Sequence, residues 1–175
     1  MRHAVSYSYY SVWQILANAP RKDDGLLDIV GFPPDSFDRI LLDPPCSALG
    51  LRPKLGIRIK AKELVKTAEY QRLFLHQAVT LLKPGGILTY STCTINALEN
   101  ERNVAFVLQE FSNLVTLVPL STKGPGQPGL AGHGLNDEQR MCVRRFDPSD
   151  KQDNCMGFFV AKFQKILIAS ESVRR

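Results

Sequence analysis

The chain contains no long apolar run. None of its 175 residues belongs to a stretch of about 18 consecutive apolar residues, so no membrane-spanning helix and no membrane partner are predicted. No basic segment followed by an apolar one occurs at Met1, so no secretory leader is predicted. We therefore expect an intracellular protein, cytoplasmic or nuclear, whose 44% hydrophobic content suffices for one globular core.

Closely spaced cysteines are also missing. The four cysteines include no Cys-x-x-Cys pair: Cys46, Cys93, Cys142 and Cys155. This spacing disfavours a disulfide framework and a zinc site, so we expect no bound metal. In a reducing compartment such thiols are free, buried or catalytic.

Positive charge is modest overall, at a net +5, but it is concentrated after Cys46. One segment carries six basic residues against the single acid Glu63: Arg52, Lys54, Arg58, Lys60, Lys62 and Lys66. Such a segment could neutralise several phosphates of a nucleic acid. It could equally be the solvated start of a helix, and charge alone does not separate the two interpretations.

The order of apolar patterns predicts an α/β fold. Strands are predicted at 37–42, 87–90, 114–118 and 158–163. A helix is predicted at 61–82, stopped by Lys-Pro-Gly-Gly at 83–86. A second helix should follow residue 94, with Asn96 as its cap and Glu99 as the reciprocal partner.

Two further segments carry weaker signals. Residues 124–129 match the dinucleotide pattern G-x-G-x-x-G, but prolines and further glycines predict a surface loop there instead of a helix start. Near the amino terminus, aromatic residues could stack on a base, although a frayed or partner-covered segment is favoured: Tyr7, Tyr9, Tyr10 and Trp13.

Two cysteines each follow a predicted strand. Cys46 comes after the strand at 37–42, and Cys93 comes after the strand at 87–90. If these strands are parallel neighbours, both thiols face one crevice beyond the carboxyl ends of the sheet. A single cysteine at a strand end is usually a small buried hydrophobic residue. Two cysteines that each follow a strand favour a paired-thiol active site. Cys142 and Cys155 match no functional motif and are interpreted as structural residues.

The residues around Cys46 suggest methylation of a nucleic-acid base. Asp43-Pro44-Pro45 is similar to the motif of nucleic-acid amino-methyltransferases, in which an aromatic residue then stacks on the base. Cys46 cannot stack. A thiolate can instead add to carbon 6 of cytosine, which activates carbon 5 toward a methyl donor. This chemistry needs a nucleophilic thiolate, an acid at ring nitrogen 3 and a second group that assists release.

These motifs together resemble the RsmB/NOP-type, or Sun-domain, S-adenosylmethionine-dependent RNA cytosine-5 methyltransferases. The resemblance covers about 37–165 and rests on DPPCSALG at 43–50, KPGG at 83–86, YSTCT at 90–94, ENE at 99–101 and GFFVAK at 157–162. It implies a Rossmann-like class I methyltransferase fold. It also implies that Cys93 is the nucleophile, that Cys46 assists product release, and that Asp43 holds the cytosine ring.

The same resemblance implies the partners. Asp43, Pro44 and Pro45 would border S-adenosylmethionine. The resemblance implies RNA as the substrate, and the charge of the segment after Cys46 predicts that Arg52, Lys54, Arg58, Lys60 and Lys62 contact it. Arg-Phe-Asp-Pro at 145–148, together with a missing central insert, is most similar to the branch that methylates transfer RNA acceptor ends.

The expected cofactor half of such a domain has no counterpart in the sequence before Phe37. Three strand and helix units would need on the order of 90 residues, and only 36 are present. We therefore predict an atypical segment at 1–36, a partial methyltransferase domain at 37–168 without its first strands and Gly-rich loop, and a tail at 169–175. A non-catalytic chain that binds RNA or a full-length partner stays an alternative. A DNA cytosine methyltransferase is disfavoured, because Cys93 would then have no role.

Overall fold

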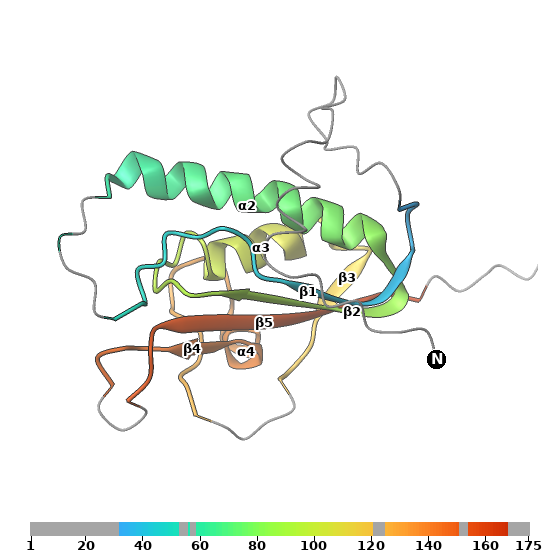
Figure 1. The fold of residues 1–175 in the computed structure, drawn as a ribbon. Coiled ribbons are helices and arrows are strands. Elements are labelled where there is room, and N and C mark those ends of the chain that lie inside the picture. Colours follow the sequence, from blue (N-terminus) through green and yellow to red (C-terminus); the bar gives the residue numbers. More distant parts are fainter. Residues whose placement is uncertain (1–31, 53–55, 57–58, 121–124, 151–153, 168–175) are drawn as a thin grey trace, which may run out of the picture.

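A computed structural model describes residues 32–52, 56, 59–120, 125–150 and 154–167 (Figure 1). The predictions for the four aromatic residues near the amino terminus, and for Lys54 and Arg58, lie outside these residues.

A five-stranded mixed sheet forms the centre of the described structure. Its order is β1-β2-β5-β3, and β4 pairs with another part of β5 (Figure 1). The strands are β1 (Phe37–Leu42), β2 (Leu82–Thr92), β3 (Val115–Leu117), β4 (Arg144–Phe146) and β5 (Phe158–Lys165). β1 and β2 are parallel, whereas β2, β3 and β4 each run antiparallel to β5. Because β1 and β2 are parallel, their carboxyl ends, which Cys46 and Cys93 follow, lie at the same edge of the sheet.

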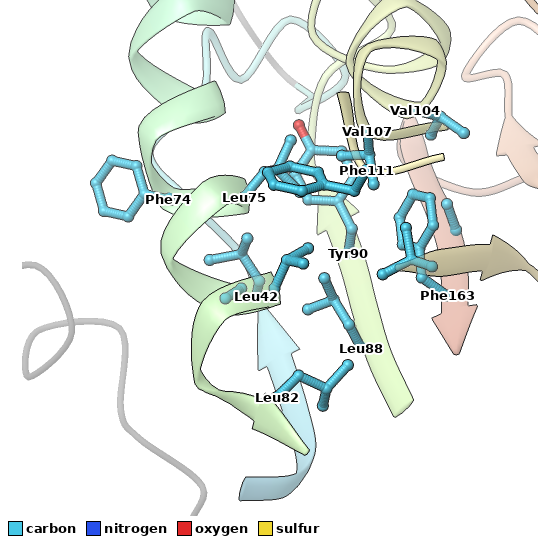
Figure 2. Close-up of a cluster of buried hydrophobic side chains, with 14 of the residues drawn as sticks. Leu42, Phe74, Leu75, Leu82, Leu88, Tyr90, Val104, Val107, Phe111 and Phe163 are labelled. Atoms are coloured by element: carbon cyan, nitrogen blue, oxygen red, sulfur yellow. The ribbon is translucent and has the colours of Figure 1, made fainter. Parts of the chain in front are cut away.

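Three helices accompany the sheet in the described residues: α2 (Ala61–Leu81), α3 (Glu101–Glu110) and α4 (Asp137–Cys142). α2 connects β1 to β2 and lies with α3 on one side of the sheet (Figure 1). Their apolar faces pack on alternate residues of the strands, because side chains on one face of a strand recur every second residue. In Figure 2, Tyr90 of β2 lies beside Leu75 of α2 and Phe111, and Leu88 belongs to the same cluster of buried hydrophobic residues.

The second helix begins later than predicted. α3 starts at Glu101 with Asn100 as its cap position, and residues 97–100 form turns. The predicted cap pair of Asn96 and Glu99 is therefore wrong. Asn96 accepts a hydrogen bond from the Leu98 backbone N–H, and the Glu99 side chain makes tertiary contacts instead. β2 also starts earlier than predicted, at Leu82, and includes the Lys-Pro-Gly-Gly segment.

The polar stretch at 121–157 contains more structure than a loop. It holds α4 and β4, neither of which the apolar pattern predicted. Within its described part, Gln127 and Arg145 exchange backbone hydrogen bonds of 2.7 and 2.8 Å. Residues 125–134 open no helix, in agreement with the rejection of a dinucleotide-binding loop.

Candidate active site at the ends of β1 and β2

The parallel pairing of β1 and β2 brings Cys46 and Cys93 together. Leu42, the last residue of β1, is in register with Tyr90 of β2, and each cysteine follows within four residues of these positions. Their Sγ atoms are 3.3 Å apart, and both residues are partly exposed. The Gly50 N–H also donates a 3.0 Å hydrogen bond to the Cys93 carbonyl. The structure thus places both thiols in one site, open to solvent.

The environment of Cys46 favours its protonated form. Burial, followed by the hydrogen bond with Cys93, raises the pKa of the Cys46 thiol from 9.0 to about 12. Near neutral pH, Cys46 is therefore a thiol that can donate a hydrogen bond to the sulfur of Cys93.

Asp43 lies directly after β1, at the same edge of the sheet as the two cysteines. The residue retains exposed surface, yet burial raises the pKa of its carboxyl. Pro44 is buried, and the carbonyl of Pro45 accepts a 2.9 Å hydrogen bond from the Gln71 side chain of α2. The segment leading to Cys46 is therefore fastened to α2.

A buried carboxylate that the sequence analysis assigned to a helix cap lies behind the thiols. Glu99 accepts hydrogen bonds from the Ser47 backbone N–H and the Ser47 hydroxyl, at 2.9 and 2.5 Å. It also accepts from the side-chain amides of Gln71 and Asn96, both at 2.9 Å. The sequence holds one signal for this role of Glu99. Glu99 belongs to the Glu-Asn-Glu motif at 99–101, and a helix cap at Glu99 does not explain the whole motif.

The loop at 43–52, called the Cys46 loop below, packs against the segment before β5. The Gly157 N–H donates to the Gly50 carbonyl at 2.8 Å, and a Cβ atom on Gly50 would overlap the Gly157 carbonyl. The guanidinium of Arg52 donates to the Cys155 carbonyl. Close backbone packing thus requires glycine at position 50.

The basic residues predicted to bind RNA are only partly described. Lys60, Lys62 and Lys66 are exposed around the first turns of α2, and Arg52 is exposed at the end of the Cys46 loop. Within the described ranges, no group of three or more His, Cys, Asp or Glu side chains is arranged to hold a metal ion. Among the same residues, no helix is long and apolar enough to span a bilayer.

A comparison with known protein families identifies the family to which this site belongs. The model of the family described as 16S rRNA methyltransferase RsmB/F matches residues 14–164. The chain belongs to the RsmB/F methyltransferase family. This confirms the family predicted from the two cysteine motifs, and the match begins upstream of the resemblance at 37–165.

Relatives of this RsmB/F chain methylate RNA according to their names. It is 42% identical over 164 residues to mouse tRNA (cytosine(72)-C(5))-methyltransferase NSUN6, covering 81% of this chain and 34% of that protein. It is 45% identical over 144 residues to the Arabidopsis thaliana rRNA (cytosine-C(5))-methyltransferase NOP2C, covering 76% of this chain and 24% of that protein. The chain thus spans about a quarter to a third of the length of these curated relatives.

Solved structures confirm the predicted fold class. The crystal structure of NSun6 from Pyrococcus horikoshii with SFG matches with a TM-score of 0.62 at 41% identity, covering 74% of this chain and 30% of that one. The crystal structure of PH0851 matches with a TM-score of 0.65 at 32% identity, covering 79% of this chain and 30% of that one. The described sheet is therefore part of a Rossmann-like methyltransferase fold.

Proposed function

We propose that this chain carries the catalytic thiols of an S-adenosylmethionine-dependent RNA cytosine-5 methyltransferase that acts on transfer RNA. The observation that supports this proposal most strongly is the 3.3 Å separation of the Cys46 and Cys93 sulfurs at the ends of parallel strands. Transfer RNA is favoured by the similarity to NSUN6 proteins, one of them 41% identical in humans, and by Arg-Phe-Asp-Pro at 145–148.

Cys93 is the proposed nucleophile. Its thiolate forms a bond to carbon 6 of cytosine, and the electron pair of the 5,6 double bond makes carbon 5 nucleophilic. Asp43 stabilises this adduct by hydrogen bonding to or protonating ring nitrogen 3. The raised pKa of its carboxyl favours the protonated donor form that this role needs.

Cys46 is proposed to assist the release of the product. After methylation, loss of the carbon 5 proton to water restores the 5,6 double bond and expels Cys93 as a thiolate. The S–H group of Cys46, kept protonated by its raised pKa, can donate a hydrogen bond to that leaving sulfur. This assignment gives the two neighbouring thiols different tasks in one reaction.

The residues after β1 fit part of a site for S-adenosylmethionine, which would supply the methyl group. The carboxyl group of Asp43 is exposed, and its carbonyl oxygen can accept a hydrogen bond from a ligand even in the protonated form. Pro44 and Pro45 set the direction of the chain beside it. The described residues contain no glycine-rich turn between a strand and a helix. We therefore assign only these three residues to the cofactor.

RNA would approach along the start of α2. Arg52, Lys60 and Lys62 are exposed and can contact phosphates without competing with the thiols for the base. The same surface supports the alternative function, in which the chain binds RNA or a full-length partner without catalysing methylation.

A covalent-trapping experiment tests the proposal. The full chain is incubated with S-adenosylmethionine and a transfer RNA acceptor-stem oligonucleotide in which 5-azacytosine replaces the target cytosine. After methyl transfer, the ring nitrogen at position 5 carries no proton to lose, so the thiol cannot be expelled. We expect an adduct that survives denaturing electrophoresis. Cys93→Ala should abolish it, and Cys142→Ala should leave it unchanged.

Cys46→Ala separates release from attack. With an ordinary cytosine oligonucleotide and S-adenosylmethionine, this variant should accumulate a stalled adduct that the unsubstituted chain does not. Adduct formation that depends on Cys46 and not on Cys93 would overturn the assignment. RNA binding with no adduct in the unsubstituted chain would favour the non-catalytic alternative.

A further inference from the structure

We infer that Glu99 is a positioning residue that holds the two thiols in reactive alignment. The inference rests on the proposed function for its consequence in catalysis, but its geometric part concerns the thiols alone. Glu99 is fully buried and lies two residues before the start of α3. Its influence on the reaction must therefore pass through other residues.

The carboxylate of Glu99 connects three separate segments. Oε1 accepts from the Ser47 hydroxyl and the Asn96 amide, and Oε2 accepts from the Ser47 N–H and the Gln71 amide. An ionised carboxylate offers about four acceptor positions, so these four donors match its full capacity. Glu99 thereby joins the Cys46 loop, α2 and the loop at 93–100 that follows β2, called the Cys93 loop.

The residue that follows each thiol belongs to this network. Ser47 follows Cys46, Thr94 follows Cys93, and their hydroxyl oxygens are 2.8 Å apart. Because the Ser47 hydroxyl donates its proton to Glu99, the Thr94 hydroxyl is the donor between these two. A displacement of Glu99 would therefore move both cysteine loops.

An uncharged isostere cannot replace this carboxylate. In Glu99→Gln, one orientation of the amide turns its NH₂ group toward the Asn96 amide. The other turns it toward the Ser47 N–H and the Gln71 amide. Either way donors face donors in a buried site, which is costly. We expect the Cys46 loop to move away from Cys93.

The rate of disulfide formation between Cys46 and Cys93 measures their alignment without RNA or cofactor. Diamide takes two electrons and two protons from the thiol pair and is reduced to a hydrazine. The experiment uses the full chain carrying Cys142→Ala and Cys155→Ala, with remaining thiols alkylated and counted by mass spectrometry. Glu99→Gln should slow the reaction on the order of 10- to 100-fold, the range that small misplacements produce.

Charge cannot account for such a slowing. Removing a negative charge near the thiols favours their thiolate forms and would, by itself, speed the oxidation. Ser47→Ala, which keeps the backbone hydrogen bond to Glu99, should give an intermediate rate.

Glu101→Gln is the matched control. Glu101 is also fully buried and lies only two residues further along, but it pairs with Arg145 and not with the Cys46 loop. This variant should lower the thermal midpoint and leave the disulfide rate unchanged. With RNA, Glu99→Gln should reduce kcat for methylation while KM for RNA stays constant.

An unchanged disulfide rate in Glu99→Gln, or an equal slowing in Glu101→Gln, would overturn the inference. If Glu99→Gln does not fold, the rate of Ser47→Ala relative to the unsubstituted chain decides in the same way. If the proposed methyltransferase function fails instead, the RNA adduct is absent while the order of disulfide rates persists.

Discussion

Cys46 and Cys93 have adjacent sulfurs, 3.3 Å apart, and the environment of Cys46 disfavours its thiolate form. Desolvation and the partner sulfur raise the pKa of the Cys46 thiol from 9.0 to about 12, a value at which a thiol is a poor nucleophile near neutral pH. The low reactivity expected of Cys46 supports Cys93 as the attacking residue, which the resemblance implied and the spacing of the motifs alone did not decide.

The raised pKa of Cys46 predicts a loss of stability at alkaline pH. Between pH 9 and pH 12 the unfolded chain releases the Cys46 proton while the folded chain retains it. The unfolded state then binds fewer protons, so the free energy of unfolding falls as pH rises through this window. Urea unfolding at a series of pH values should show a smaller decrease in Cys46→Ala than in the unsubstituted chain. Parallel slopes would contradict the proposed environment of Cys46.

At the scale of elements, a buried ion pair fixes β4. Arg145 of β4 donates to both carboxylate oxygens of Glu101 at the start of α3, and a third bond reaches the Ile95 carbonyl at 2.8 Å. The side chains of Arg145 and Glu101 are 7% and 0% exposed. The pair thus ties β4 to the start of α3, and the separate bond from Arg145 to the Ile95 carbonyl does not involve Glu101.

Breaking this pair should be strongly destabilising. Arg145→Met leaves the Glu101 carboxylate buried without its partner, and such a loss costs about 3–5 kcal/mol. Arg144→Met is the control, because Arg144 lies next to Arg145 in β4 and, within the described part of the chain, donates to the Met141 and Val143 carbonyls and not to a carboxylate. Chemical denaturation should show a cost below about 1 kcal/mol for this control. Equal costs in both variants would contradict a special role for the pair.

The elements differ in how far their local sequence determines them. β1, α2 and β5 were predicted because their apolar spacing is continuous, and α2 matched to within one residue. β4 was missed because its Arg145 depends on Glu101, which lies 44 positions away in the chain. α4 was missed because none of its six residues is buried, so it shows no apolar periodicity. The start of α3 was misplaced because Glu99 binds Ser47 and Gln71 and is not available to cap a helix.

At the scale of the whole molecule, the sheet determines which distant residues meet. The meeting of Cys46 and Cys93 was predictable, because parallel neighbouring strands end at the same edge. The network around Glu99 was not, because buried polar contacts leave no periodic signal in a sequence. The roles of Asp43 and of the basic residues around Lys60 and Lys62 remain predictions that variants must test.

The proposed function depends above all on the attack of Cys93 on cytosine. The most direct measurement is tandem mass spectrometry of the unsubstituted chain after trapping with the 5-azacytosine oligonucleotide and digestion by protease and nuclease. We expect the nucleotide remnant to be attached to the Sγ of Cys93, with Cys46 unmodified. A remnant on Cys46, or on either cysteine outside the pair, would contradict it.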